Sequence, residues 1–290
     1  MPDGGTAVAA PPLVRPRIGP VGILPPALVL AVLFLYPLAL IVREALVGDV
    51  GTPGESGLAS SLAVLASPFF VHALGNTVLI AVAATAGCVL VGLVLALLLS
   101  FVPFPGAGLV ARLIDTFVAL PTFLVTLAFT FLYGSAGILN EVLVRAFGFA
   151  TPPIDFLYTA WGVVLAEVTV YTPFVLRPLL AAFSQLDRAQ VEVASVLGAR
   201  PWRIVHSVIL PAAVPALAAG GSLCLLLTVN EFGIVLFIGA KGVITLPLLV
   251  YDKAIQESAY AIACTIAVVN IALSLALFGL YRMAAARFET

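Results

Sequence analysis

The sequence is poor in charged residues, which make up 9% of its 290 residues, while 62% are hydrophobic. Soluble domains carry about 25% charged residues, so a water-exposed protein of this composition would lack the polar surface to cover its core. We therefore expect most of the surface to face a lipid bilayer. The formal net charge of −1 gives no basic field, which argues against nucleic-acid binding.

The residues that usually carry metal, redox or nucleotide chemistry are also scarce. Cys88, Cys224 and Cys264 fall in apolar runs, and His72 and His206 are isolated, so we predict neither a metal site nor a cofactor. The chain has no Gly-x4-Gly-Lys-Ser/Thr loop and is not expected to bind ATP in that way. No apolar segment holds the paired groups of an intramembrane catalyst, so we expect a protein that is not an enzyme.

Six apolar segments are long enough to cross a bilayer as helices. They are roughly residues 23–42, 77–102, 113–133, 158–180, 212–233 and 260–281. The first is too long for the apolar part of a signal peptide and is interpreted as a retained span. The sequence therefore predicts an all-α, polytopic membrane protein with one transmembrane domain over residues 21–290.

Two further stretches are not expected to span. Residues 1–20 are rich in Pro, Gly and Ala and predict a disordered tail. Residues 234–259 are apolar but interrupted by Gly239, Lys241 and Pro247, so we place them as an external or re-entrant element.

The distribution of Lys and Arg predicts the orientation, because cytoplasmic loops carry an excess of these residues. With six spans, both termini lie on one side of the membrane, together with the loops at 103–112 and 181–211. Nine of the 13 Lys and Arg residues fall on that side: Arg15, Arg17, Arg112, Arg177, Arg188, Arg200, Arg203, Arg282 and Arg287. We therefore expect both termini and the 181–211 loop to be cytoplasmic.

Residues 187–211 form the longest polar, arginine-bearing segment of the chain. Asp187 predicts a helix N-cap with Gln190 in the capping-box position, and Gly198 predicts the end of that helix. Pro201 suits the first turn of a second helix, which Pro211 is expected to limit. The segment therefore predicts two short helices with a bend between them, a compact projection that a partner could bind.

The same segment resembles the signature of ABC importer permeases, in which Glu-Ala-Ala is followed at fixed spacing by Gly, Ile and Leu-Pro. The matching residues here are Glu192, Val193, Ala194, Gly198, Val208, Leu210 and Pro211, with Val193 and Val208 departing conservatively. The resemblance implies that the two helices are coupling helices that dock on separate ATPase subunits. Arg200 and Arg203 are candidates to meet acidic groups there. It also implies a second permease subunit, an extracytoplasmic solute-binding protein and location in a bacterial inner membrane.

Four polar residues within or at the ends of the predicted spans are candidates for the solute pathway. Glu167 and Tyr171 lie in the fourth span, and Asn230 and Glu231 end the fifth. Ionisable groups in a membrane usually face the bundle interior or a water path. The alternatives are a hydrogen bond between helices for Glu167 and a headgroup contact for Glu231, and the sequence leaves both open.

The solute is suggested by resemblance alone. Residues 230–251 resemble the permeases for 2-aminoethylphosphonate, and more broadly those for sulfate, molybdate, ferric iron and polyamines. An ion-coupled secondary transporter is a less favoured alternative, because such proteins usually contain internal repeats and no convincing repeat is visible here.

Overall fold

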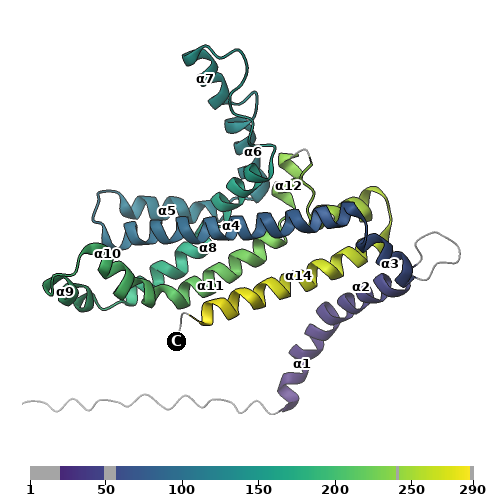
Figure 1. Ribbon diagram of the computed structural model, residues 1–290. Helices are drawn as coiled ribbons and strands as arrows, with labels where there is room; N and C mark the ends of the chain where they lie inside the picture. Colours follow the sequence, from purple (N-terminus) through teal and green to yellow (C-terminus); the bar gives the residue numbers. More distant parts are fainter. Residues whose placement is uncertain (1–19, 49–56, 240–241, 288–290) are drawn as a thin grey trace, which may run out of the picture.

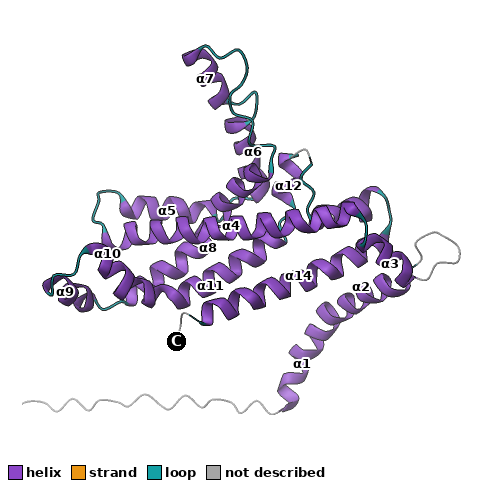
Figure 2. Cartoon of the chain, in the orientation of Figure 1, coloured by secondary structure: helices purple, strands orange, loops and turns teal. Residues whose placement is uncertain are grey.

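The computed structural model describes residues 20–48, 57–239 and 242–287, and within these ranges the chain consists of helices and loops (Figure 2). The elements, in which η marks a π-helical turn, are α1 (Pro20–Leu30), η1 (Ala31–Leu35), α2 (Tyr36–Val47), α3 (Gly57–Leu65), α4 (Pro68–Phe101), α5 (Ala107–Phe117), α6 (Thr122–Tyr133), α7 (Ile138–Phe147), α8 (Ala160–Gln185), α9 (Arg188–Val196), α10 (Pro201–Ile204), η2 (Val205–Ile209), α11 (Leu210–Val229), α12 (Gly233–Ile238), α13 (Leu246–Tyr251), η3 (Asp252–Gln256) and α14 (Tyr260–Ala286). The all-α prediction is confirmed. The predicted tail, apart from Pro20, and Lys241 lie outside the described residues.

Six helical stretches of the described chain are long and apolar enough to cross a membrane, which confirms the predicted number. They are Leu24–Val47, Pro68–Phe101, Thr122–Phe147, Ala160–Gln185, Pro201–Val229 and Tyr260–Ala286. The second begins at Pro68 rather than near residue 77. The Ser67 hydroxyl accepts a hydrogen bond from Phe70 N at 3.2 Å and caps the helix, while Pro68 occupies the first turn.

The third predicted span, residues 113–133, is wrong as a single helix. It is divided between α5 and α6, because Pro121 lacks the N–H that would continue α5 and restricts the residue before it. The stretch that qualifies as a span instead comprises α6 and α7, which a turn at Gly134–Gly137 separates. The described residues between 233 and 259 include the short elements α12, α13 and η3, none of which is long enough to span.

Helices α4, α8, α11 and α14 lie side by side and form the core bundle (Figure 1). The close approach of α4 and α11 to α8 depends on glycines that face Val175 of α8. A Cβ on Gly92 of α4 would lie 3.1 Å from the Val175 side chain, and one on Gly220 of α11 would lie 2.9 Å from the Val175 Cα. Small residues at these contacts let α8 pack tightly between its two neighbours.

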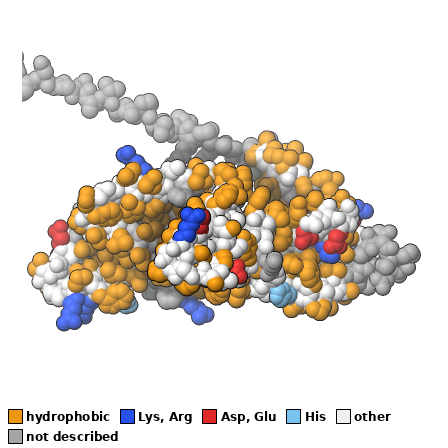
Figure 3. Space-filling view, turned by 90° about the horizontal axis from the view of Figure 1, so that it is seen from above, with side chains coloured by type: hydrophobic (Ala, Val, Ile, Leu, Met, Phe, Trp, Pro, Cys, Tyr) orange, Lys and Arg blue, Asp and Glu red, His pale blue; other side chains and the backbone are white. Residues whose placement is uncertain are grey.

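Two apolar arms extend from this bundle. In Figure 1, α2 packs against α14 and α1 runs obliquely away from the bundle, while α6 and α7 rise from its middle. The most apolar 18-residue part of Leu24–Val47 has no buried residue. Figure 3 shows hydrophobic side chains over most of the face seen from above, with charged groups in a few places. Such surfaces require lipid or another subunit as their environment.

Candidate functional site

The bend in residues 187–211 begins with a capped helix. Asp187 Oδ1 accepts a hydrogen bond from Ala189 N at 3.0 Å, while Gln190 N bonds to the Asp187 carbonyl, also at 3.0 Å. The predicted side-chain cap is therefore present, with Ala189 as the donor. The helix α9 runs from Arg188 to Val196, close to the predicted range.

Gly198 ends α9 because it adopts a left-handed backbone conformation, with φ of +81°. Gly198 N donates to the Ser195 carbonyl at 2.9 Å, and Ala199 N donates to the Ala194 carbonyl at 3.0 Å. A Cβ added at Gly198 would meet no atom within 4 Å. Glycine is therefore favoured here by backbone conformation and not by lack of space.

After the bend, the predicted limit at Pro211 is wrong. Helix α10 continues through the π turn η2 into α11, so that one helical stretch runs from Pro201 to Val229. Leu210 N bonds to the Val205 carbonyl across this turn. The π turn lets the helix pass a proline without a break, because the bonding pattern shifts where the proline N–H is missing. The bend is therefore joined directly to the fifth span.

The outer surface of the bend is apolar to an unusual degree. Val196 is 87% exposed, Leu197 81% and Trp202 76%. Glu192, Val193, Arg200 and Arg203 are exposed as well, whereas Ala194 is half-buried against the bundle. Leu210 is half-buried and Pro211 exposed at the start of α11. Large exposed apolar side chains beside charged ones are typical of a protein-binding surface.

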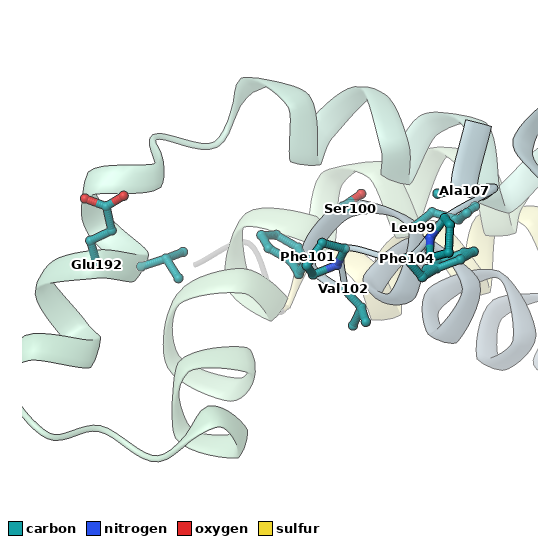
Figure 4. A pocket seen from close by; sticks show the side chains of 10 residues that line it. Leu99, Ser100, Phe101, Val102, Phe104, Ala107 and Glu192 are labelled. Atoms are coloured by element: carbon teal, nitrogen blue, oxygen red, sulfur yellow. The ribbon is translucent and has the colours of Figure 1, made fainter.

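A groove of about 750 Å³ lies between this bend and the end of α4 (Figure 4). Figure 4 shows Phe101 and Phe104 on one side and Glu192 of α9 on the other, and Val191 of α9 also lines the groove. The sequence did not indicate that residues 99–107 take part. The Pro103–Gly106 stretch marked a loop, but nothing in it pointed to α9.

The second site is a buried cluster in the bundle, formed by Glu167, Tyr171 and Glu231, which are 1%, 5% and 8% exposed. The Tyr171 hydroxyl donates a hydrogen bond to Glu231 Oε2, and Ile234 N donates to Glu231 Oε1 at 2.8 Å. Glu167 lies one turn before Tyr171 on the same face of α8. Its Oε2 is buried without a hydrogen-bond partner.

Asn230 is not part of this cluster, although it precedes Glu231. It is exposed, and its Nδ2 donates to Leu226 O at 2.8 Å and to Ser274 Oγ at 3.2 Å. Its Oδ1 accepts a hydrogen bond from Asn270 Nδ2 at 3.0 Å. Asn230 therefore links α11 to α14. Sequence reasoning missed Asn270 and Ser274, although an asparagine within an apolar span was a signal for such a contact.

The buried residues of the described bundle include two acidic side chains and no basic one. Glu167 and Glu231 are its buried charged residues, and no described Lys or Arg is buried with them. No group of three or more His, Cys, Asp or Glu side chains in the described chain is placed to hold a metal ion. What the cluster offers is carboxylate oxygens and one phenol.

The sequence matches the family described as binding-protein-dependent transport system inner membrane component over residues 88–290. It is 62% identical over 262 residues to a Salmonella typhimurium protein named "Putative 2-aminoethylphosphonate transport system permease protein PhnU", covering 90% of this chain and 91% of that protein. It is 33% identical over 218 residues to the sulfate transport system permease protein CysT of Escherichia coli, covering 74% of this chain and 76% of that protein.

Two solved structures share the fold. A bacterial ABC transporter involved in the import of the acidic polysaccharide alginate matches with a TM-score of 0.76 and 18% identity, over 93% of this chain and 96% of that chain. The methionine ABC transporter MetNI in an inward-facing conformation matches with a TM-score of 0.53 and 19% identity, over 76% of this chain and 94% of that chain. With its six apolar helices, the chain is a multi-pass inner-membrane protein, and it belongs to the binding-protein-dependent transport system inner membrane components, the permease subunits of ABC importers.

Proposed function

We propose that this permease carries 2-aminoethylphosphonate inward across the membrane. The observation that carries the proposal is the 62% identity to the Salmonella typhimurium protein of that name, which extends over nine-tenths of both chains. The sulfate permease CysT is related at 33% identity, so sulfate is the competing solute. Molybdate, ferric iron and polyamines remain the wider alternatives.

The energy for import comes, in this proposal, from separate ATPase subunits that bind the bend between α9 and α10. Exposed Val196, Leu197 and Trp202 supply apolar contacts, and Arg200 and Arg203 supply positive charge around them. A complementary acidic rim on the ATPase would favour this docking. The permease itself hydrolyses nothing and needs no cofactor.

We infer the other partners and the orientation from the distribution of basic residues and from the family. The termini and the bend face the cytoplasm, and the opposite side meets an extracytoplasmic solute-binding protein. A second permease subunit covers part of the apolar surface left open by α1 and α2. The alginate transporter that shares the fold is described in complex with a periplasmic protein bound to alginate pentasaccharide, which supports a binding-protein partner here.

We also propose that Glu167, Tyr171 and Glu231 lie on the solute pathway. They are polar, they come from α8 and from the link between α11 and α12, and they meet where these elements pack together. Asn230 contributes from outside the cluster, by fixing the end of α11 against α14.

The solute is tested by competition in proteoliposomes that contain the permease, its ATPase and its binding protein. Uptake of labelled 2-aminoethylphosphonate should be suppressed by unlabelled 2-aminoethylphosphonate and unaffected by equal sulfate. Uptake of labelled sulfate with no uptake of the aminophosphonate would reject the proposed solute in favour of the competing one.

The docking surface is tested separately by photo-crosslinking. A photoreactive residue placed at Val196, which is 87% exposed, should crosslink to the ATPase. The same residue at Phe147, which is 71% exposed at the end of α7, should not. Crosslinking from Phe147 but not from Val196 would place the ATPase elsewhere.

A further inference from the structure

The buried interior of the described bundle holds two carboxyl groups without a basic partner. Glu167 and Glu231 are buried, and no basic side chain of the described residues is buried near them. Carboxylates in a low-dielectric interior are unfavourable unless a positive charge or sufficient hydrogen bonds compensate them. The cluster therefore offers two carboxyl groups to which no basic side chain is paired.

The two carboxyl groups differ in how well they are satisfied. Both oxygens of Glu231 accept hydrogen bonds, one from the Tyr171 hydroxyl and one from Ile234 N. Glu167 Oε2 has no partner although the side chain is 1% exposed. Glu167 lies one helical turn before Tyr171, which hydrogen-bonds to Glu231, and its carboxyl group is near enough to Glu231 to interact with it electrostatically. The unpaired oxygen thus belongs to the same cluster and can accept a hydrogen bond from a donor.

We propose that Glu167, Tyr171 and Glu231 form a recognition site for the primary ammonium group of the transported solute. This inference rests on the proposed function, since 2-aminoethylphosphonate carries an ammonium group at one end and a phosphonate at the other. An ammonium group donates three hydrogen bonds and carries the positive charge that the cluster lacks. Glu167 Oε2 accepts one of these hydrogen bonds directly.

The same chemistry excludes other occupants. Two carboxylates repel a phosphonate or a sulfate, so the anionic end of the solute must lie outside the cluster. A metal ion would need further ligands, and the described His, Cys, Asp and Glu side chains provide no group of three. A proton bound to Glu167 is the remaining alternative to an ammonium group, and replacing Glu167 by glutamine distinguishes the two.

The cluster is closed in this structure, so the solute must separate α8 from the end of α11 to reach it. These helices are in close contact, with Gly220 of α11 against the backbone of Val175. Because α10, η2 and α11 form one helical stretch, movement of the docking bend shifts α11 directly. The site thus lies where movement that starts at the bend can open it.

The test compares two solutes that differ by the amine, 2-aminoethylphosphonate and ethylphosphonate, in proteoliposomes with the complete transporter and binding protein. Glu167→Gln and Glu231→Gln remove the charge with little change in shape. Glu141→Gln is the matched control, because Glu141 is an exposed residue of α7 paired with Arg145. Since the binding protein is the same in every preparation, its own selectivity cancels when each variant is divided by wild type.

We expect each of the two cluster variants to lower 2-aminoethylphosphonate uptake about tenfold or more, as for loss of a charge-assisted hydrogen bond. Ethylphosphonate uptake should fall by less than about threefold, since it has no ammonium group to lose the contact. The control should leave both unchanged. An equal fall for both solutes would make the cluster structural and overturn the inference. If Glu167→Gln takes up 2-aminoethylphosphonate at the wild-type rate, Glu167 binds a proton and not the amine, and the inference is also overturned.

Failure of the proposed solute can be distinguished by adding putrescine and sulfate to the panel. If putrescine is transported and its uptake falls in both variants, the amine site stands and 2-aminoethylphosphonate is the wrong solute. If sulfate is transported and both variants match wild type, the inference and the proposed function fail together. Infrared difference spectra of the purified transporter add a readout that does not depend on transport. Adding 2-aminoethylphosphonate or putrescine should shift carboxylate bands in wild type, and the part of that shift that arises from Glu167 should be missing in Glu167→Gln. No shift with either amine would refute the site.

Discussion

Replacing Gly198 by alanine should loosen the bend between α9 and α10 and uncouple ATP hydrolysis from transport. Gly198 has φ of +81°, a conformation in which an L residue other than glycine is strained. No atom lies within 4 Å of the position that a Cβ would take, so steric contact with the rest of the protein adds nothing. The cost is therefore the conformational one, ~1–2 kcal/mol.

That cost acts locally. It should reduce the population of the bent geometry relative to alternatives by about five- to thirtyfold, without unfolding the six spans. The assay is the ratio of solute imported to ATP hydrolysed in proteoliposomes, and this ratio should fall in the alanine variant. Gly198→Asn should keep most of the ratio, because asparagine tolerates the left-handed region better than alanine does. Gly279→Ala in α14 is the matched control, since it has open space and lies within a helix.

A different order of the variants would refute this reasoning. If alanine at position 198 couples as well as glycine, the left-handed bend is not required for docking. If asparagine is worse than alanine, side-chain size at the partner surface decides the result, and backbone conformation does not.

Three further outcomes follow from the structure. Trp202→Ala should weaken ATPase binding to the permease in nanodiscs by ~2 kcal/mol or more, because the exposed indole is expected to be an interface hot spot. His206→Ala, at another exposed position, should leave the binding unchanged. Equal binding by the two variants would count against the apolar docking surface. Asn230→Ala should lower the free energy of unfolding by ~1–3 kcal/mol, because it leaves Asn270 Nδ2 of α14 without its partner. An unchanged melting temperature would show that the bonds of Asn230 to α14 contribute nothing. Gly220→Ala should destabilise the protein by ~1–3 kcal/mol, because the added Cβ would lie 2.9 Å from the backbone of α8. Gly279→Ala should leave the melting temperature near that of wild type. Equal stability of the two variants would argue against tight packing of α8 on α11.

Hydropathy predicted the number of spans because bilayer thickness fixes how much apolar sequence a helix needs. It did not reveal the break between α5 and α6, since the segment stays apolar on both sides of Pro121. Proline was a signal there, but the same signal misled at Pro211, where a π turn carries the helix past it. A proline marks a missing donor, and the surrounding structure decides whether the helix ends or adapts.

The candidate sites differ in how far the sequence could describe them. The α9 bend was predictable because Asp187 and Gly198 act through local backbone conformation. Glu167 and Tyr171 could be placed on one helix face by their spacing. The hydrogen bond from Tyr171 to Glu231 depends on how α8 packs against the end of α11. The two residues are 60 positions apart in the sequence, and no local pattern predicts that they meet. Asn230 was grouped with Glu231 as its neighbour, but the two side chains leave the α11–α12 link in different directions.

The most direct test of ATP-driven import through this permease is accumulation of 2-aminoethylphosphonate in proteoliposomes with and without ATP on the ATPase side. We predict accumulation against a gradient when ATP, the ATPase and the binding protein are all present, and none when any one is withheld. Accumulation that continues without ATP and follows a proton or sodium gradient would contradict the account.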